Sequence, residues 1–199
     1  MTANQKPNTG FRIGVSVAMI IMMLGVVISL DVLTTYSITD TTKKITEINN
    51  PISKSLSDVS SMQINQRTII HSATSIHSFS DTSDYEMLKD QFYSYSDMNE
   101  LQLQQIRNDL NESSNTFSDP QIYSWITAIN DIKSLNAEYS QIGQQIFNSV
   151  DMKKPNVAQL VSTFDSDAVK IHIMESSLSD KIDKSTQEYE DYIDISKEK

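Results

Sequence analysis

The stretch IGVSVAMIIMMLGVVISL, residues 13–30, decides the architecture of this chain, because none of its side chains is charged. Val32 and Leu33 extend it beyond Asp31 to about 20 residues, which at about 1.5 Å per residue spans a hydrocarbon core of about 30 Å. The sequence therefore predicts one transmembrane helix over residues 13–33.

Two other interpretations of this stretch fit its sequence less well. A cleaved signal peptide has an apolar region of about 7 to 15 residues that ends in small residues, and the following VISLDVLTTYS offers no such site. A prepilin-like cut after Gly10 would place Val15 where a pilin carries glutamate. We therefore favour a retained anchor. Lys6 and Arg12 are the only charged residues before it, so residues 1–12 are expected in the cytoplasm and the remainder outside the cell membrane.

Composition excludes several function classes for the external part. All 26 acidic residues lie beyond residue 30 with 14 of the 16 basic ones, a net charge of −12 that repels nucleic acid and anionic lipid surfaces. The chain has no cysteine, and it contains no Ser-His-Asp arrangement, HExxH motif or phosphate-binding loop. Its three histidines occupy no core position. We therefore expect no enzyme activity, no cofactor, no metal site and no nucleic-acid partner.

The external part is predicted to be all-α. Only one of the four glycines, Gly143, lies beyond residue 30, so the turns that strand-rich folds require cannot be built. Apolar residues instead recur at alternating spacings of three and four, the pattern of a helix with one buried face. This pattern predicts helices at about 34–79, 82–111, 120–150 and 155–197.

Each predicted helix has one row of apolar residues with a few polar interruptions. Ser55 and Gln66 interrupt the first row, Asn99 and Gln102 the second, Asn136 and Gly143 the third, and Glu175 and Ser185 the fourth. Asn49-Asn50-Pro51 is expected to break or kink the first helix, because proline lacks a backbone donor. Asp119-Pro120 is a strong start signal for the third helix.

Short connections predict that successive helices are antiparallel, in an up-down-up-down four-helix bundle with long first and fourth helices. The first helix would rise from the anchor and the fourth would return to the membrane, so these two would form a stem below Pro51. The extracytoplasmic domain is accordingly placed at residues 34–199.

This order of elements resembles the four-helix-bundle sensor domains of methyl-accepting chemotaxis receptors and related sensor kinases. The resemblance covers the whole chain but rests on element order and length, without a signature motif. It implies a homodimer that binds a small solute and responds by displacement of its last helix. In that family the last helix continues into a second membrane helix and a cytoplasmic module, so the chain is expected to be either the sensory half of a longer receptor or a free-standing anchored module.

A candidate ligand site follows from counting down each helix from the far end of the bundle. Gln66, Tyr95, Asn99 and Asn136 are then expected in one layer, where buried polar groups need hydrogen bonds, water or a ligand. The alternative is that these amides fix helix register. Arg67 is the best single ligand contact, because a guanidinium forms two parallel bonds with a carboxylate; the alternative is an ion pair with a nearby acid.

Two further residues carry predictions. Asn111 begins an N-glycosylation acceptor, Asn-Glu-Ser, in a segment that composition predicts as a loop. Glu175 would cost free energy if it were buried unpaired, and we expect Lys54 or Lys133 to pair with it. The chain is thus interpreted as a chemoreceptor-like sensor of a small solute, or alternatively as an anchored helical module that docks a periplasmic or extracellular partner protein or another envelope protein.

Overall fold

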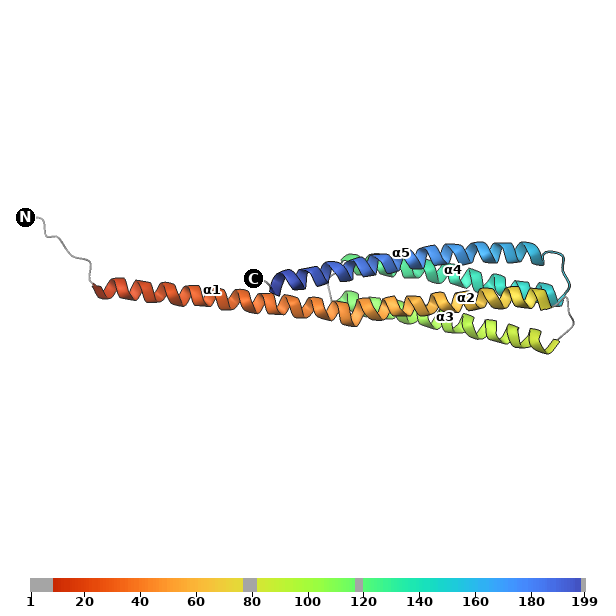
Figure 1. Cartoon of the computed structure of the whole chain (residues 1–199), viewed down its shortest axis with the longest axis horizontal. Helices are drawn as coiled ribbons and strands as arrows, with labels where there is room; N and C mark the ends of the chain where they lie inside the picture. Colours follow the sequence, from red (N-terminus) through yellow and green to blue (C-terminus); the bar gives the residue numbers. More distant parts are fainter. Residues whose placement is uncertain (1–8, 77–81, 117–119, 198–199) are drawn as a thin grey trace, which may run out of the picture. The chain divides into compact units, whose positions relative to one another are not determined.

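A computed structural model describes residues 9–76, 82–116 and 120–197. Within these ranges the chain is helical apart from a turn at residues 152–156, and it contains no strand (Figure 1). The elements are α1 (Thr9–Lys44), the π-helical turn η1 (Ile45–Asn49), α2 (Asn50–Ile76), α3 (Thr82–Thr116), α4 (Pro120–Asp151) and α5 (Val157–Lys197). The predicted all-α class is therefore confirmed for the described part of the chain.

The chain divides into two compact units. The larger contains Ile45–Glu188, and Figure 1 shows its portions of α2, α3, α4 and α5 lying side by side. The other contains α1 and the end of α5 from Tyr189, where the Ser37 and Tyr192 hydroxyls are 2.9 Å apart. In this division residues 34–44 are grouped with the rest of α1 and with the end of α5, and the predicted start of the extracytoplasmic domain at residue 34 stays a prediction.

Helix α1 carries its apolar side chains on every side. The large apolar residues described between Met19 and Leu33 are all 55 to 69% exposed. Exposure of this extent is unfavourable in water and marks a surface that contacts another apolar medium or protein. By length and composition, one helix among the described residues, near the N-terminus, is able to cross a membrane.

The expected break at Asn49-Asn50-Pro51 takes the form of one widened turn. Residues 45–49 form η1, and Pro51 is the second residue of α2. The proline ring crowds the carbonyl four residues earlier, that of Glu47, and cannot donate a hydrogen bond to it. A π-helical turn widens the backbone at this point, so the helix continues through the proline.

Large aromatic side chains fill the interior of the Ile45–Glu188 unit. Phe92, Tyr139, Phe147 and Phe164 are fully buried. The rings of Tyr139 and Phe164 stack with their centres 3.9 Å apart, and Phe92 meets Phe147 edge-on at 5.5 Å. Because such rings bury large apolar areas and pack in fixed orientations, they hold α3, α4 and α5 together.

The buried rows follow the predicted ones with one systematic difference. Leu56 and Leu103 are buried, whereas their predicted neighbours Ser55 and Gln102 are only half-buried. The apolar face of a bundle helix is at least about 100° wide, so two adjacent positions can both face the core. The prediction assumed one core-facing position per turn and therefore missed Leu56 and Leu103.

The sequence predicted the start of α4 correctly but placed the end of α3 too early. Helix α3 continues to Thr116 and does not end at Asn111, so Asn111 lies in a helix, half-buried, and its carbonyl accepts a hydrogen bond from Ser114 Oγ at 2.8 Å. The loop expected around the glycosylation acceptor is therefore absent at this residue, and use of the acceptor stays a prediction. Helix α4 begins at Pro120, and the expected cap Asp119 lies outside the described residues.

Gly143 is required by the close approach of α4 to α3. A Cβ atom at this position would lie 2.1 Å from Phe92 Cζ and 2.8 Å from two further atoms of the same ring. The Phe92 ring cannot move aside, because the Phe147 and Phe164 rings pack against it. The glycine that interrupts the third apolar row thus makes room for the central aromatic residue.

We predict that Gly143→Ala lowers the free energy of unfolding by about 1–3 kcal/mol through overpacking. Without the clash, alanine would stabilise a helix interior by about 1 kcal/mol relative to glycine, so the sign of the change is decisive. Thermal unfolding of the purified chain, followed by circular dichroism, measures it. Gly25→Ala is the matched control, since no atom lies within 4 Å of a Cβ there; a stabilised Gly143→Ala variant would contradict the packing.

Candidate functional site

A layer of polar side chains lies inside the bundle unit at the level that the sequence predicted. Gln66 on α2 and Asn99 on α3 are both fully buried. Gln66 Nε2 donates to Ser96 Oγ at 2.7 Å, and Asn99 Nδ2 donates to Gln66 Oε1 at 2.8 Å. One glutamine therefore holds two groups of the neighbouring helix by hydrogen bonds in a low-dielectric interior, where such bonds are strong.

A second hydrogen-bonded pair extends the layer to α4. Gln63 Nε2 donates to Asn136 Oδ1 at 3.3 Å, and both side chains are buried. The hydroxyl of Tyr139 also donates to the backbone carbonyl of Gln63, at 3.3 Å. Three of the predicted site residues, Gln66, Asn99 and Asn136, thus lie within the buried layer, and the two pairs connect α2 with both α3 and α4.

Sequence reasoning missed Gln63 and Ser96. Both occupy the second core-facing position of their helices, next to the row that the spacing selected. Their amide and hydroxyl groups gave no independent signal, because serine and glutamine are abundant along the whole chain. The layer is not completely satisfied: among the described residues, Asn99 Oδ1 is buried without a hydrogen-bond partner.

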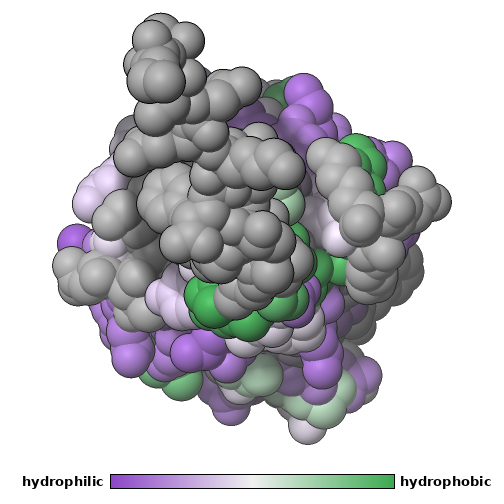
Figure 2. Space-filling model, turned by 90° about the vertical axis from the view of Figure 1, so that its left-hand side faces the viewer, coloured by the Kyte–Doolittle hydropathy of each residue, from purple (hydrophilic) through white to green (hydrophobic). Residues whose placement is uncertain are grey.

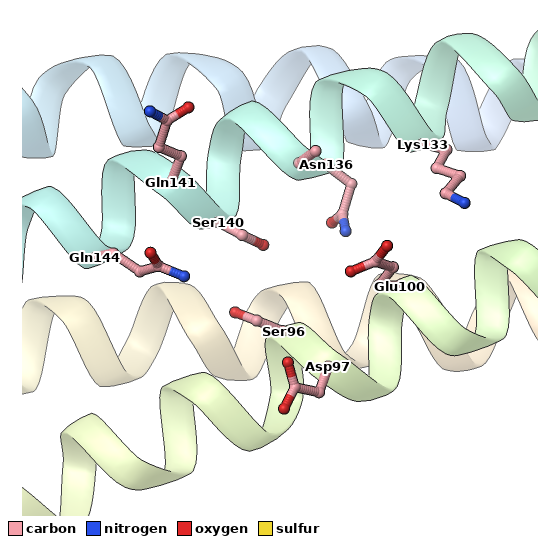
Figure 3. Close-up of a pocket in the computed structure, with 9 residues that line it drawn as sticks. Ser96, Asp97, Glu100, Lys133, Asn136, Ser140, Gln141 and Gln144 are labelled. Atoms are coloured by element: carbon pink, nitrogen blue, oxygen red, sulfur yellow. The ribbon is translucent and has the colours of Figure 1, made fainter.

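A groove between α3 and α4 opens onto this layer (Figure 3). It encloses about 200 Å³ and includes Ser96 and Asn136, the two residues that belong to both the layer and the groove. Its other charged and polar lining residues are Asp97, Glu100, Lys133, Ser140, Gln141 and Gln144. Figure 3 shows Ser96 and Ser140 extending between the two helices and Asn136 facing Glu100.

The groove offers hydrogen-bond donors and acceptors together with charges of both signs. The Lys133 ammonium donates to Gln104 Oε1 on α3, and the carboxylates of Asp97 and Glu100 are exposed. Such a lining is suited to a small polar solute, because several convergent polar groups fix the orientation of a ligand. Among the described residues there is no cluster of three or more metal-ligating side chains.

Arg67 lies elsewhere, although it follows Gln66 directly in sequence. Its Nε donates to Asp165 Oδ1 at 2.7 Å, and His71 Nε2 is 3.0 Å from the same oxygen. Arg67 is about half exposed and lines a separate groove of about 200 Å³ between α2 and α5. Successive residues of a helix point in directions about 100° apart, so Gln66 faces the core while Arg67 faces outward.

The five predicted ligand-binding residues therefore do not form one pocket. Gln66 and Asn99 are in the buried layer, Asn136 joins the layer to the α3–α4 groove, and Arg67 forms the ion pair that the alternative interpretation described. Tyr95 is half-buried against the apolar core and lines neither groove. Their roles in binding stay predictions.

Asp165 is held ionised by its two basic neighbours. Partial burial raises its pKa, but the hydrogen bonds from Arg67 and His71 more than offset this, so the pKa lies below its ordinary value. Because folding lowers the pKa, the pair stabilises the fold above the unfolded pKa of the carboxyl, and this contribution is lost as the pH falls.

We predict that Gln66→Ala destabilises the chain by about 2–4 kcal/mol, because it deprives Ser96 and Asn99 of their shared buried partner and leaves a cavity. Urea unfolding followed by circular dichroism provides the measurement. Gln105→Ala is the control, since Gln105 is exposed and bonds only within α3, to Asp109. Equal losses in the two variants would contradict a buried layer at Gln66.

We predict that Arg67→Ala raises the pKa of Asp165 toward the ordinary aspartate value. The variant should lose less than about 1 kcal/mol of stability at neutral pH, because the ion pair is partly exposed. Carboxyl carbon chemical shifts recorded across the acid range give the pKa directly. Lys184→Ala, which removes an exposed charge near Glu188, should leave the Asp165 titration unchanged.

The site is thus a buried layer of amides and a hydroxyl that meets the α3–α4 groove at Ser96 and Asn136 and the α2–α5 groove at Gln63. Comparison of the chain with family models, with curated proteins and with solved structures finds no match. The geometry of the site and the order of the helices are therefore the observations that bear on function.

Proposed function

We propose that this chain is the membrane-anchored, extracytoplasmic ligand-sensing domain of a chemoreceptor-like signal transducer. The observation that carries the proposal is the polar layer, which bonds α2 to α3 and α4 and meets a solvent-open groove at Ser96 and Asn136. A solute in that groove would compete for hydrogen bonds that hold the helices in register. Binding would then be coupled to helix position.

The proposed topology is an antiparallel, up-down-up-down bundle. Bonds from η1 and α2 to α5 support it: Asn49 of η1 pairs with Thr186 at 2.9 Å, and on α2 Ser53 pairs with Asp183 at 3.4 Å and Arg67 with Asp165. Partners on α5 thus come earlier in sequence as the α2 residues come later, which is the relation between two antiparallel helices. Short connections favour the same order throughout.

The proposed anchor is the apolar part of α1, residues 13–33. Its exposed apolar side chains would be covered by lipid, and a helix satisfies all of its backbone hydrogen bonds internally, as the bilayer core requires. Lys6 and Arg12 precede the anchor, which favours a cytoplasmic N-terminus and an extracytoplasmic bundle.

The proposed output is a small displacement of α5, and the proposed assembly is a homodimer. Helix α5 is 41 residues long and contributes to both compact units, so it is able to carry a change from the bundle toward the membrane. Packed helices slide past one another in small steps when ligands favour one packing over another. The groove itself lies on α3 and α4, so the coupling would pass through the layer to α2 and then to α5.

One observation favours a second function, an anchored helical module that docks another envelope protein. Met87, Met98 and Leu101 on α3 are each more than half exposed. With about 3.6 residues per turn, their spacing places them on one side of α3. An exposed apolar row of this kind is typical of a surface that binds a partner.

We predict that at least one small polar solute stabilises the purified full chain in a thermal-shift screen of amino acids, organic acids and metabolites. A ligand at a hundredfold excess over its Kd should contribute about 2.7 kcal/mol. Asn136→Ala should abolish the shift, and Arg67→Ala should preserve it if the α3–α4 groove is the site.

The two variants also locate the ligand. A shift that disappears in Arg67→Ala but persists in Asn136→Ala would move the site to the groove between α2 and α5. Absence of any shift across the panel, together with recovery of a bound envelope protein that is lost in Met98→Ser and Leu101→Ser, would replace sensing by docking.

A further inference from the structure

A second polar groove lies between α2 and α5, separate from the polar layer. It encloses about 350 Å³, and its walls contain one carboxylate, that of Glu175, and one apolar side chain, that of Leu56. The remaining lining residues are all serines: Ser53, Ser57, Ser60, Ser176 and Ser179. The groove is therefore lined by serines of both helices and by one acidic residue.

Glu175 lacks the partner that a buried carboxylate needs. It is only 3% exposed, and among the described residues neither of its oxygens has a hydrogen-bond partner. The expected ion pair is absent: the Lys133 ammonium donates to Gln104, and Lys54 is exposed on α2. Burial raises the pKa of Glu175 to about 7, although the neighbouring Gln63 and Ser60 side chains act in the opposite direction.

A buried, unpaired carboxylate is costly, and native structures retain such groups where a ligand, ion or function requires them. A component that carries positive charge and donates hydrogen bonds would stabilise the ionised form of Glu175. We propose that this groove binds a small primary ammonium, with the charged nitrogen between the Glu175 carboxylate and the serine hydroxyls.

Three features favour a primary ammonium over other cations. A single carboxylate balances one positive charge, whereas divalent cations prefer several anionic oxygens. An ammonium group has three N–H donors, which suit one carboxylate and two hydroxyl acceptors. The volume exceeds that of a bare ion, and Leu56, itself buried, provides an apolar wall for a short carbon chain.

The proposed site is distinct from the sensing site, because it shares no residue with the layer or with the α3–α4 groove, although Gln63 of the layer lies beside Glu175. Ser60 is shared with the neighbouring groove that contains Arg67 and His172, and Ser176 is shared with a third groove along α5. Binding of an ammonium would therefore be observed whether or not the chain senses a different solute.

The test is isothermal titration of the full chain in lipid nanodiscs with propylammonium chloride. One-site binding is expected, with Glu175→Gln raising Kd by at least about tenfold through loss of a charge-assisted bond. Ser57→Ala should raise Kd by a smaller factor. Asp58→Asn removes a neighbouring exposed charge on α2 and should leave Kd unchanged.

Two control compounds test whether binding requires both the charge and the N–H donors of the ammonium group. Neutral 1-propanol has the same carbon chain without the charge and should not bind, and potassium chloride at equal concentration should not displace propylammonium. The proposal is overturned if propylammonium shows no saturable binding, if Glu175→Gln binds it as tightly as the original chain, or if potassium competes equally. Circular dichroism of each variant establishes that it is folded.

Discussion

Burial of Gln66 between α2 and α3 is the constraint on which the rest of the bundle depends. An amide in an apolar interior must be hydrogen-bonded, and Gln66 meets this requirement only with Ser96 and Asn99 in register. The Gln63–Asn136 pair imposes the same condition on α4. Apolar packing alone tolerates sliding of one helix along another, whereas these bonds select one alignment.

The polar layer and the aromatic packing both stabilise the bundle. Phe92 fits into the space left by Gly143 and packs against Phe147 and Phe164. Tyr139 belongs to both, since its ring stacks on Phe164 and its hydroxyl donates to the Gln63 carbonyl. A change in the hydrogen bonds of the polar layer would therefore alter the aromatic packing through Tyr139.

The fold was largely predictable from sequence, and the site only in part. Strong periodicity and a single glycine beyond residue 30 favour a helical fold, which the described residues have, and Pro120 marks the start of α4 correctly. The polar residues Gln66, Asn99 and Asn136 interrupt the apolar rows of their helices. These interruptions predicted the buried layer, because a polar residue in a core-facing row is expected to be buried. The outward direction of Arg67 depends on side-chain angles, and the missing ion pair of Glu175 depends on where lysines lie on other helices. Neither can be read from the spacing of residues along one helix.

The central claim is that solute binding acts on the buried amides. The most direct measurement is the nuclear magnetic resonance spectrum of the side-chain amide groups of Gln66, Asn99 and Asn136 in the full chain, with and without a stabilising solute. The account predicts that all three signals shift together as the solute saturates, since their hydrogen bonds connect the groove to α2. Saturation that leaves these three signals unchanged, while other residues shift, would contradict it.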